Sequence, residues 1–211
     1  KLIAFTMFKS EKLPVVIKMP QKPKGANWAK PARNTNRLKH EADGRGYLKP
    51  GFTHIYTIPS QGGTPEQITS GNYNHTGTLS FSPDSKSIYF SANRVEDWEY
   101  DFRNSEVYNV DIHTKLIKVL TSQKGPDFSP KVSPNGKKIA FLGFKDNVQT
   151  HQNRVLYLMN SSGKNRTTIS GNFDNSISNI VWDSLGNGLY FTYDEKGNSK
   201  VYCTWYFVYI S

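Results

Sequence analysis

The sequence predicts an all-β fold, a β-propeller built from four-stranded antiparallel blades. Three observations support this prediction. A turn motif, a strand with a central tyrosine and a short strand that ends in hydroxyl residues all recur along the chain, and they share one interval near 50 residues. Such an interval is typical of propeller blades, because each blade is one supersecondary unit that buries its faces only against its neighbours.

The first recurring element is a turn between two strands. Its copies begin at Phe81-Ser82-Pro83-Asp84, Val132-Ser133-Pro134-Asn135 and Trp182-Asp183-Ser184-Leu185. Each copy runs into a strand whose closing phenylalanine stands at 90, 141 or 191, at intervals of 51 and 50 residues. Pro presets a turn dihedral and Asp or Asn bonds the backbone downstream, so the motif predicts a hairpin. Residues 1–5 resemble the end of a fourth copy.

Two further elements complete each unit. A strand of period 2 carries a tyrosine at 56, 108, 157 and 202. A short fourth strand follows at 67–71, 119–122 and 168–171, rich in Ile, Thr and Ser. A β-sandwich also has frequent turns, but it gives no reason for one fixed interval.

The domain organisation expected from these markers is a single, incomplete propeller region over residues 1–211. About four repeat units are present, and the clearer ones span about 78–123, 129–171 and 178–211. A basic, Pro- and Lys-rich insertion over 20–52 interrupts the first unit. Both edge units lack expected parts, and the sequence has no initiating Met. We therefore expect a piece of a larger chain whose N-terminus lies upstream, with open blade edges that favour self-association.

Charge and composition exclude several classes of partner. The net charge is +10, but residues 1–50 hold 12 of the 27 Lys and Arg and only 3 of the 17 Asp and Glu. The basic excess is thus one local stretch rather than a groove for nucleic acid. No apolar run reaches the roughly 18 residues of a membrane-spanning helix. We expect no nucleic-acid or membrane partner, and the compartment stays open between cytoplasm and periplasm.

No cofactor or metal is expected. The chain has one cysteine and five histidines, and the histidines lack metal-ligand spacing. The nucleophile motif Gly-x-Ser-x-Gly is also absent from the sequence.

Several segments resemble the propeller of acylaminoacyl-peptidase-like and dipeptidyl-peptidase-like members of the prolyl oligopeptidase family. TolB-type propellers share the turn motifs. Two stretches are more specific, Asp43-Gly44-Arg45-Gly46-Tyr47-Leu48 and Ala92-Asn93-Arg94. The supporting segments are 39–48, 53–56, 62–71, 91–94, 97–100 and 105–108, and the resemblance covers about residues 1–202.

The resemblance implies a two-domain serine peptidase. Its propeller would cover the active-site cleft of a C-terminal α/β-hydrolase domain and filter peptide substrates by size. The catalytic residues of that family lie in the hydrolase domain, so none is assigned to this sequence. In related dipeptidyl peptidases a pair of Glu residues on the propeller holds the substrate's α-amine.

The candidate substrate-binding residues lie in one acidic and aromatic loop. Its run Asp97-Trp98-Glu99-Tyr100 resembles the amine-binding segment but lacks adjacent Glu residues. Carboxylates here would hold an ammonium group through charge-assisted hydrogen bonds. The competing interpretations are a solvated loop with weak ion pairs and, for the arginine, a structural role toward loop carbonyls. The candidates are Arg94, Glu96, Asp97, Trp98, Glu99 and Tyr100.

Three functional hypotheses follow. The first is a non-catalytic, substrate-gating propeller of a prolyl-oligopeptidase-family serine peptidase, with a C-terminal α/β-hydrolase domain and peptides as partners. The alternative is a TolB-like propeller that acts as a protein-interaction module. A propeller lyase or metalloenzyme would require a bound metal ion.

Overall fold

The chain folds into strands joined by turns and loops. A computed structural model describes residues 1–13, 20–29, 33–171 and 173–205 and shows sixteen strands there. No helix in these ranges has the length and apolarity to cross a membrane. The predicted unit 178–211 and insertion 20–52 include residues 206–211 and 30–32, which lie outside the described residues.

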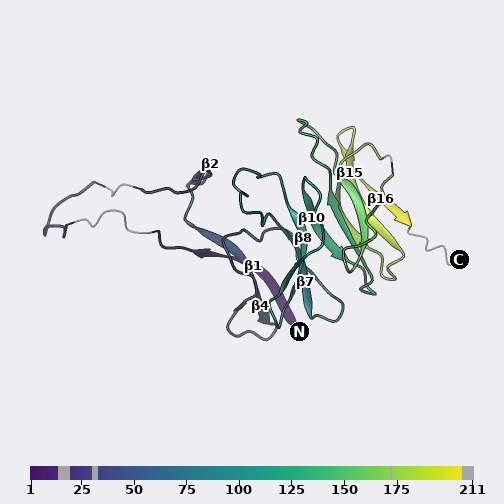
Figure 1. Cartoon of the computed structure of the whole chain (residues 1–211), viewed down its shortest axis with the longest axis horizontal. Coiled ribbons are helices and arrows are strands. Elements are labelled where there is room, and N and C mark those ends of the chain that lie inside the picture. Colours follow the sequence, from purple (N-terminus) through teal and green to yellow (C-terminus); the bar gives the residue numbers. More distant parts are fainter. Residues whose placement is uncertain (14–19, 30–32, 172, 206–211) are drawn as a thin grey trace.

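Four antiparallel sheets follow one another along the chain, and we call them blades I to IV (Figure 1). In a complete blade the strands are called A to D in chain order. The predicted fold class, an all-β propeller with incomplete edge units, is confirmed. Blade I contains β1 (Leu2–Ser10), β4 (Gly51–Pro59) and β5 (Glu66–Gln67). Blade II contains β6 (Ser80–Phe81), β7 (Ser87–Ala92), β8 (Glu106–Asp111) and β9 (Ile117–Val119).

Blade III repeats the four-stranded order of blade II, and blade IV has three strands. Blade III contains β10 (Asp127–Val132), β11 (Lys138–Gly143), β12 (Val155–Asn160) and β13 (Thr167–Thr168). Blade IV contains β14 (Ile177–Trp182), β15 (Gly188–Glu195) and β16 (Asn198–Trp205).

A long segment, 11–50, connects β1 to β4 in blade I. Its described residues reach away from the blades, and a small hairpin lies near its base (Figure 1). The hairpin pairs β2 (Glu41–Ala42) with β3 (Gly46–Tyr47). Strands β1 and β4 pair in continuous register on either side of it, so blade I tolerates the insertion without a break in its ladder.

The recurring phenylalanine and tyrosine are direct cross-strand partners in every blade. The side chains stack or tilt against each other with ring centroids 5.3–6.0 Å apart. Such aromatic pairs add about 0.5–1.5 kcal/mol beyond the area they bury. The pairs are Phe5–Tyr56, Phe90–Tyr108, Phe141–Tyr157 and Phe191–Tyr202.

The recurring hydroxyl residues fasten the outermost strand to its neighbour. Thr69 Oγ1 accepts a hydrogen bond from Ile55 N at 2.9 Å, and Thr121 Oγ1 accepts one from Val107 N at the same distance. Ser170 Oγ does the same for Leu156 N at 3.3 Å. The hydroxyl residues that recur after each short fourth strand therefore satisfy backbone donors that the short strands leave unpaired.

The turns between strands A and B stack on one another across the blade junctions. A Cβ added to Gly136 would lie 3.4 Å from Pro83, and one added to Gly186 would lie 3.2 Å from Pro134. Both glycines have positive φ, 72° and 75°. Successive blades approach so closely here because the Pro of one turn meets the Gly of the next.

One backbone hydrogen bond recurs at each junction between blades. His75 N donates to Thr53 O at 2.8 Å and Asp127 N donates to Ser105 O at 2.7 Å. Ile177 N donates to Arg154 O at 3.1 Å. All three donor residues are fully buried. These bonds define equivalent places in the three junctions, although the residue types there differ.

Candidate functional site

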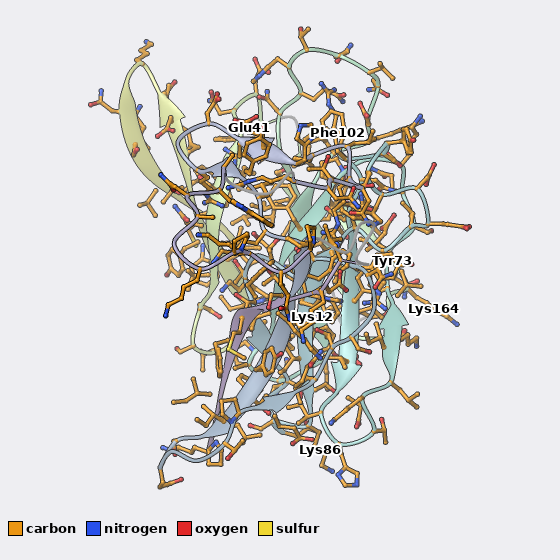
Figure 2. The ribbon with its side chains drawn as sticks, turned by 90° about the vertical axis from the view of Figure 1, so that its left-hand side faces the viewer. Lys12, Glu41, Tyr73, Lys86, Phe102 and Lys164 are labelled. Atoms are coloured by element: carbon orange, nitrogen blue, oxygen red, sulfur yellow. The ribbon has the colours of Figure 1, made fainter. Side chains whose placement is uncertain are left out.

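The two ends of the blades differ in their connections. The loops between strands B and C are long at 11–50, 93–105 and 144–154, and the connections from one blade to the next lie at the same end. We call this the loop end. The A–B and C–D turns lie at the other end, the turn end. Figure 2 shows Phe102 and Lys86, both from blade II, at opposite ends, with Glu41 on the side of Phe102.

A row of cavities follows the loop end. The largest, of about 570 Å³, lies between the base of segment 11–50 and Trp98. A second, of about 450 Å³, shares Asn74, Thr76 and Trp98 with it. A third and a fourth, of about 370 and 350 Å³, continue past Arg103 to the loop 144–154. The cavities thus run from blade I to blade III, within the 300–1,000 Å³ range of ligand pockets.

All six predicted site residues lie at or near this row, on the connection 93–105. Asn93 closes the loop, since its Nδ2 donates to Asp101 O at 2.7 Å. Glu96, Asp97 and Tyr100 are exposed, whereas Trp98 and Glu99 are half-buried. Of the six, Trp98 and Tyr100 line cavities, and Trp98 forms the wall between the two largest.

Arg94 differs from the other five because its guanidinium lies in the junction of blades I and II. Its Nη1 donates to His75 Nε2 and to Ser70 O, the latter at 3.4 Å. The guanidinium also lies over the rings of Tyr73 and Tyr108, at 4.7 and 5.9 Å from their centroids. Burial lowers the pKa of Arg94. These contacts match the structural interpretation, in which Arg94 satisfies a loop carbonyl.

The loop also presents acceptors without partners. Glu99 Oε1 and Asn104 Oδ1 are shielded from solvent and make no hydrogen bond within the described residues. Asn104 lines the second cavity. Unpaired buried acceptors cost about 1–3 kcal/mol each, so a donor from a ligand would be stabilised there.

Sequence reasoning missed two polar clusters in the blade junctions. His54 and His75 meet with ring centroids 5.3 Å apart, beside Arg94. Burial, then the positive charge of Arg94, lowers the pKa of His75 to about 4, so its imidazole is neutral at pH 7. His75 Nδ1–H then donates to Thr53 O at 3.2 Å, and Nε2 accepts from Arg94.

The second missed cluster joins blades II and III. Asp127 is fully buried and receives both guanidinium nitrogens of Arg166, at 2.8 and 3.1 Å. Glu106 is 8% exposed and accepts a hydrogen bond from Thr121 Oγ1. Burial, together with the negative charge of the neighbouring Asp127, raises the pKa of Glu106 to about 7.

The missed clusters occupy equivalent places. His54 and His75 correspond to Glu106 and Asp127, because each pair flanks the recurring junction hydrogen bond. Only that bond reveals the equivalence, and it joins residues that are 22 or 23 positions apart and of no fixed type. Within the described part of the chain, no three His, Cys, Asp or Glu side chains gather closely enough to hold a metal ion.

Comparison with known proteins places these observations in a family. Residues 26–142, more than half of the chain, match the family described as the dipeptidyl peptidase IV N-terminal region. A probable dipeptidyl-peptidase 5 of Aspergillus clavatus is 36% identical over 80 residues, 37% of this chain and 11% of that protein. Dipeptidyl-peptidase 5 of Porphyromonas gingivalis is 26% identical over 143 residues, 66% of this chain and 21% of that protein.

A solved structure shows the same fold. TolB from Acinetobacter baumannii superposes with a TM-score of 0.57 at 21% identity, over 72% of this chain and 34% of that one. The matched region is about a fifth or less of each of these two curated relatives. The resemblance to the propeller region of the prolyl oligopeptidase family is therefore confirmed: the chain belongs to the family of the dipeptidyl peptidase IV N-terminal region.

Proposed function

We propose that the chain is the substrate-gating propeller portion of a serine peptidase of the prolyl oligopeptidase family. Its specificity would be acylaminoacyl- or dipeptidyl-peptidase-like. In this proposal the catalytic α/β-hydrolase domain lies outside these 211 residues, and the propeller supplies no catalytic group. The observation that carries the proposal is the row of cavities at the loop end, in a chain that belongs to a peptidase propeller family.

The loop end suits contact with extended peptides. Its cavities share walls, so one chain of several residues would cross more than one of them. The walls mix aromatic rings with amide and hydroxyl groups that bond peptide backbone, a mixture typical of ligand pockets. On the loop 93–105, the unpaired acceptor of Glu99 and the exposed carboxylates of Glu96 and Asp97 would receive the ammonium group of a peptide.

The test uses the full-length protein encoded by the same gene. Peptides that carry one cleavable end and a tail of increasing length are compared by kcat/KM. Phe102→Ser alters a residue that lines two cavities and is 75% exposed. Leu116→Ser at the turn end, 72% exposed, is the matched control. We expect kcat/KM to fall with tail length, and only Phe102→Ser to change KM.

Two results would overturn the proposal. One is turnover of an acyl-peptide or aminoacyl amide by the 211-residue chain alone. The other is a coding sequence that continues past Ser211 without an α/β-hydrolase and its Gly-x-Ser-x-Gly motif.

The alternative function, a TolB-like interaction module, is favoured by the exposed apolar side chains of β16. Val201 is 70% exposed and Trp205 is 57% exposed. Strand β16 pairs with β15 alone among the described strands. Recovery of a stoichiometric protein partner that is released by Val201→Lys would support this alternative.

A further inference from the structure

The largest cavity combines positive charge with apolar walls. Among the described residues, four cationic side chains and no acidic one line it. These four are Arg37, Lys39, Arg45 and Lys49. Its apolar walls are formed by Phe8 of β1, by Trp98 of the loop 93–105, and by Leu13, Leu48 and Pro50 at the base of segment 11–50.

Arg37 is held in place by three contacts. Its Nη1 donates to Gly51 O at 2.8 Å, and its Nη2 pairs with Glu11 Oε2 at 3.2 Å. The guanidinium lies over the ring of Phe52, 3.9 Å from the centroid. Arg37 is thus neutralised and rigid, and it shapes the floor of the cavity more than it attracts a ligand.

The other three cations are positioned by the hairpin β2–β3. Arg45 N donates to Ala42 O at 3.0 Å, which closes the turn, and Gly44 and Gly46 supply positive φ there. Leu48 N donates to His40 O at 2.8 Å and extends the hairpin ladder by one step. Lys39 and Lys49 each stand one residue beyond this last hydrogen-bonded pair.

These three cations lack counter-ions. Among the described residues, none of Lys39, Arg45 and Lys49 forms an ion pair. An anion in the cavity would gain charge-assisted hydrogen bonds from these side chains. The guanidinium of Arg45 also offers the planar fork that fits a carboxylate.

We infer that this cavity binds a carboxylate-bearing segment of peptide, with acidic side chains as the anions. The inference rests in part on the proposed function, since a peptide at the loop end is what that function brings here. Two observations favour a peptide as the occupant. The cavity is contiguous, through Trp98, Asn74 and Thr76, with the second cavity and its unpaired acceptor Asn104 Oδ1. Its volume of about 570 Å³ suits a few residues.

The test measures binding to the 211-residue chain directly. Fluorescent peptides with capped ends and two glutamates are compared with glutamine and lysine counterparts by polarisation at low salt. A glutamine peptide with a free C-terminus separates the terminal carboxylate from side-chain carboxylates. We expect the glutamate peptide to bind at least tenfold more tightly than all three, with an affinity that falls as salt rises.

Matched variants locate the binding. The triple variant Lys39→Gln, Arg45→Gln and Lys49→Gln removes the three unpaired cations. The control, Lys86→Gln, Lys137→Gln and Lys164→Gln, removes the same charge at the turn end (Figure 2 labels Lys86 and Lys164). We expect the first to weaken glutamate-peptide binding at least tenfold and the control to change it less than twofold. Circular dichroism verifies that both variants fold.

Several outcomes would overturn the inference. One is equal affinity for the glutamate and glutamine peptides. Another is an equal loss of glutamate-peptide affinity in the two triple variants. A third is a single-stranded oligonucleotide that binds more tightly than the glutamate peptide and whose binding the first triple variant abolishes. Tighter binding of the free C-terminus would also contradict the assignment to acidic side chains. If binding fails while Phe102→Ser still changes KM in the full-length enzyme, the gating function stands and only this site is lost.

Discussion

Single residues in the blade junctions set how stability depends on pH. His75 and Glu106 lie in the equivalent polar clusters of two adjacent junctions, and burial favours the neutral form of both. The pKa of the first is lowered and that of the second is raised, so their effects on the free energy of unfolding have opposite signs.

His75 should destabilise the fold in mild acid. Between its ordinary pKa of 6.5 and its folded pKa of about 4, the unfolded chain binds a proton that the folded chain does not. This contribution to stability is fully present above pH 6.5 and is lost as pH falls toward 4, by about 3 kcal/mol at most. Relative to wild type, His75→Gln should therefore gain stability over this window in urea titrations. A constant difference between the two proteins from pH 7 to 4 would contradict the assignment.

Glu106 should destabilise the fold in mild base. Its folded pKa of about 7 lies above its ordinary 4.5, so the folded chain binds the extra proton between these values. Its contribution is favourable at low pH and is lost as pH rises through 7. Glu106→Gln should thus raise the free energy of unfolding at pH 8 relative to wild type, by on the order of 1–2 kcal/mol in urea titrations, and have little effect at pH 5. Equal effects at both pH values would disprove this.

At the scale of strands and turns, the contact between successive A–B turns determines how closely the blades approach. Gly186 and Gly197 both have positive φ, 75° and 77°. A Cβ at Gly186 would meet Pro134 at 3.2 Å, whereas one at Gly197 would meet nothing within 4 Å. The two positions therefore separate backbone strain from crowding between blades.

Gly186→Ala should be more destabilising than Gly197→Ala. Each substitution costs about 1–2 kcal/mol because an L-residue enters the left-handed region. The first also forces two turns apart, and we expect about 1 kcal/mol more from this crowding. Thermal unfolding of both variants gives the comparison, and a larger loss for Gly197→Ala would argue against the stacking of turns.

The side of β16 that no described strand covers should drive self-association. Unpaired strand edges with apolar side chains template further pairing, and a lysine on the edge suppresses it. Val201→Lys should lower the mean mass measured by light scattering at high protein concentration. Leu116→Lys, on an exposed turn residue, is the control and should leave the mass unchanged. A wild-type chain that stays monomeric would refute this prediction.

The strands were predictable from the sequence because their partners are close along the chain and of constant type. Phe90 and Tyr108, for example, stand in one hairpin and recur in the next blades. Pairs such as His54 with His75, or Glu106 with Asp127, were not predictable. Their places are fixed by a backbone bond between blades, and any side chain that satisfies its partners is compatible with that bond. The cavity at segment 11–50 was missed because its basic residues form one local stretch of sequence, whereas Trp98, which completes its wall, lies far away along the chain.

For the molecule as a whole, opposite titrations in adjacent junctions should cancel. The windows of His75 and Glu106 overlap from pH 4.5 to 6.5. We expect the free energy of unfolding of the wild type to be nearly flat there, within about 1 kcal/mol. Each single variant should acquire a slope, of opposite sign in the two cases. A steep wild-type profile over this range in urea titrations would show that other groups dominate.

The junction of blades III and IV has no titrating pair at the equivalent places, Val155 and Ile177. The same backbone hydrogen bond thus forms beside a pair of histidines, a pair of acidic residues or a pair of apolar side chains. An engineer who exchanged only these two side chains at each junction could retune the acid tolerance of each junction separately, without substituting any residue of the loop 93–105.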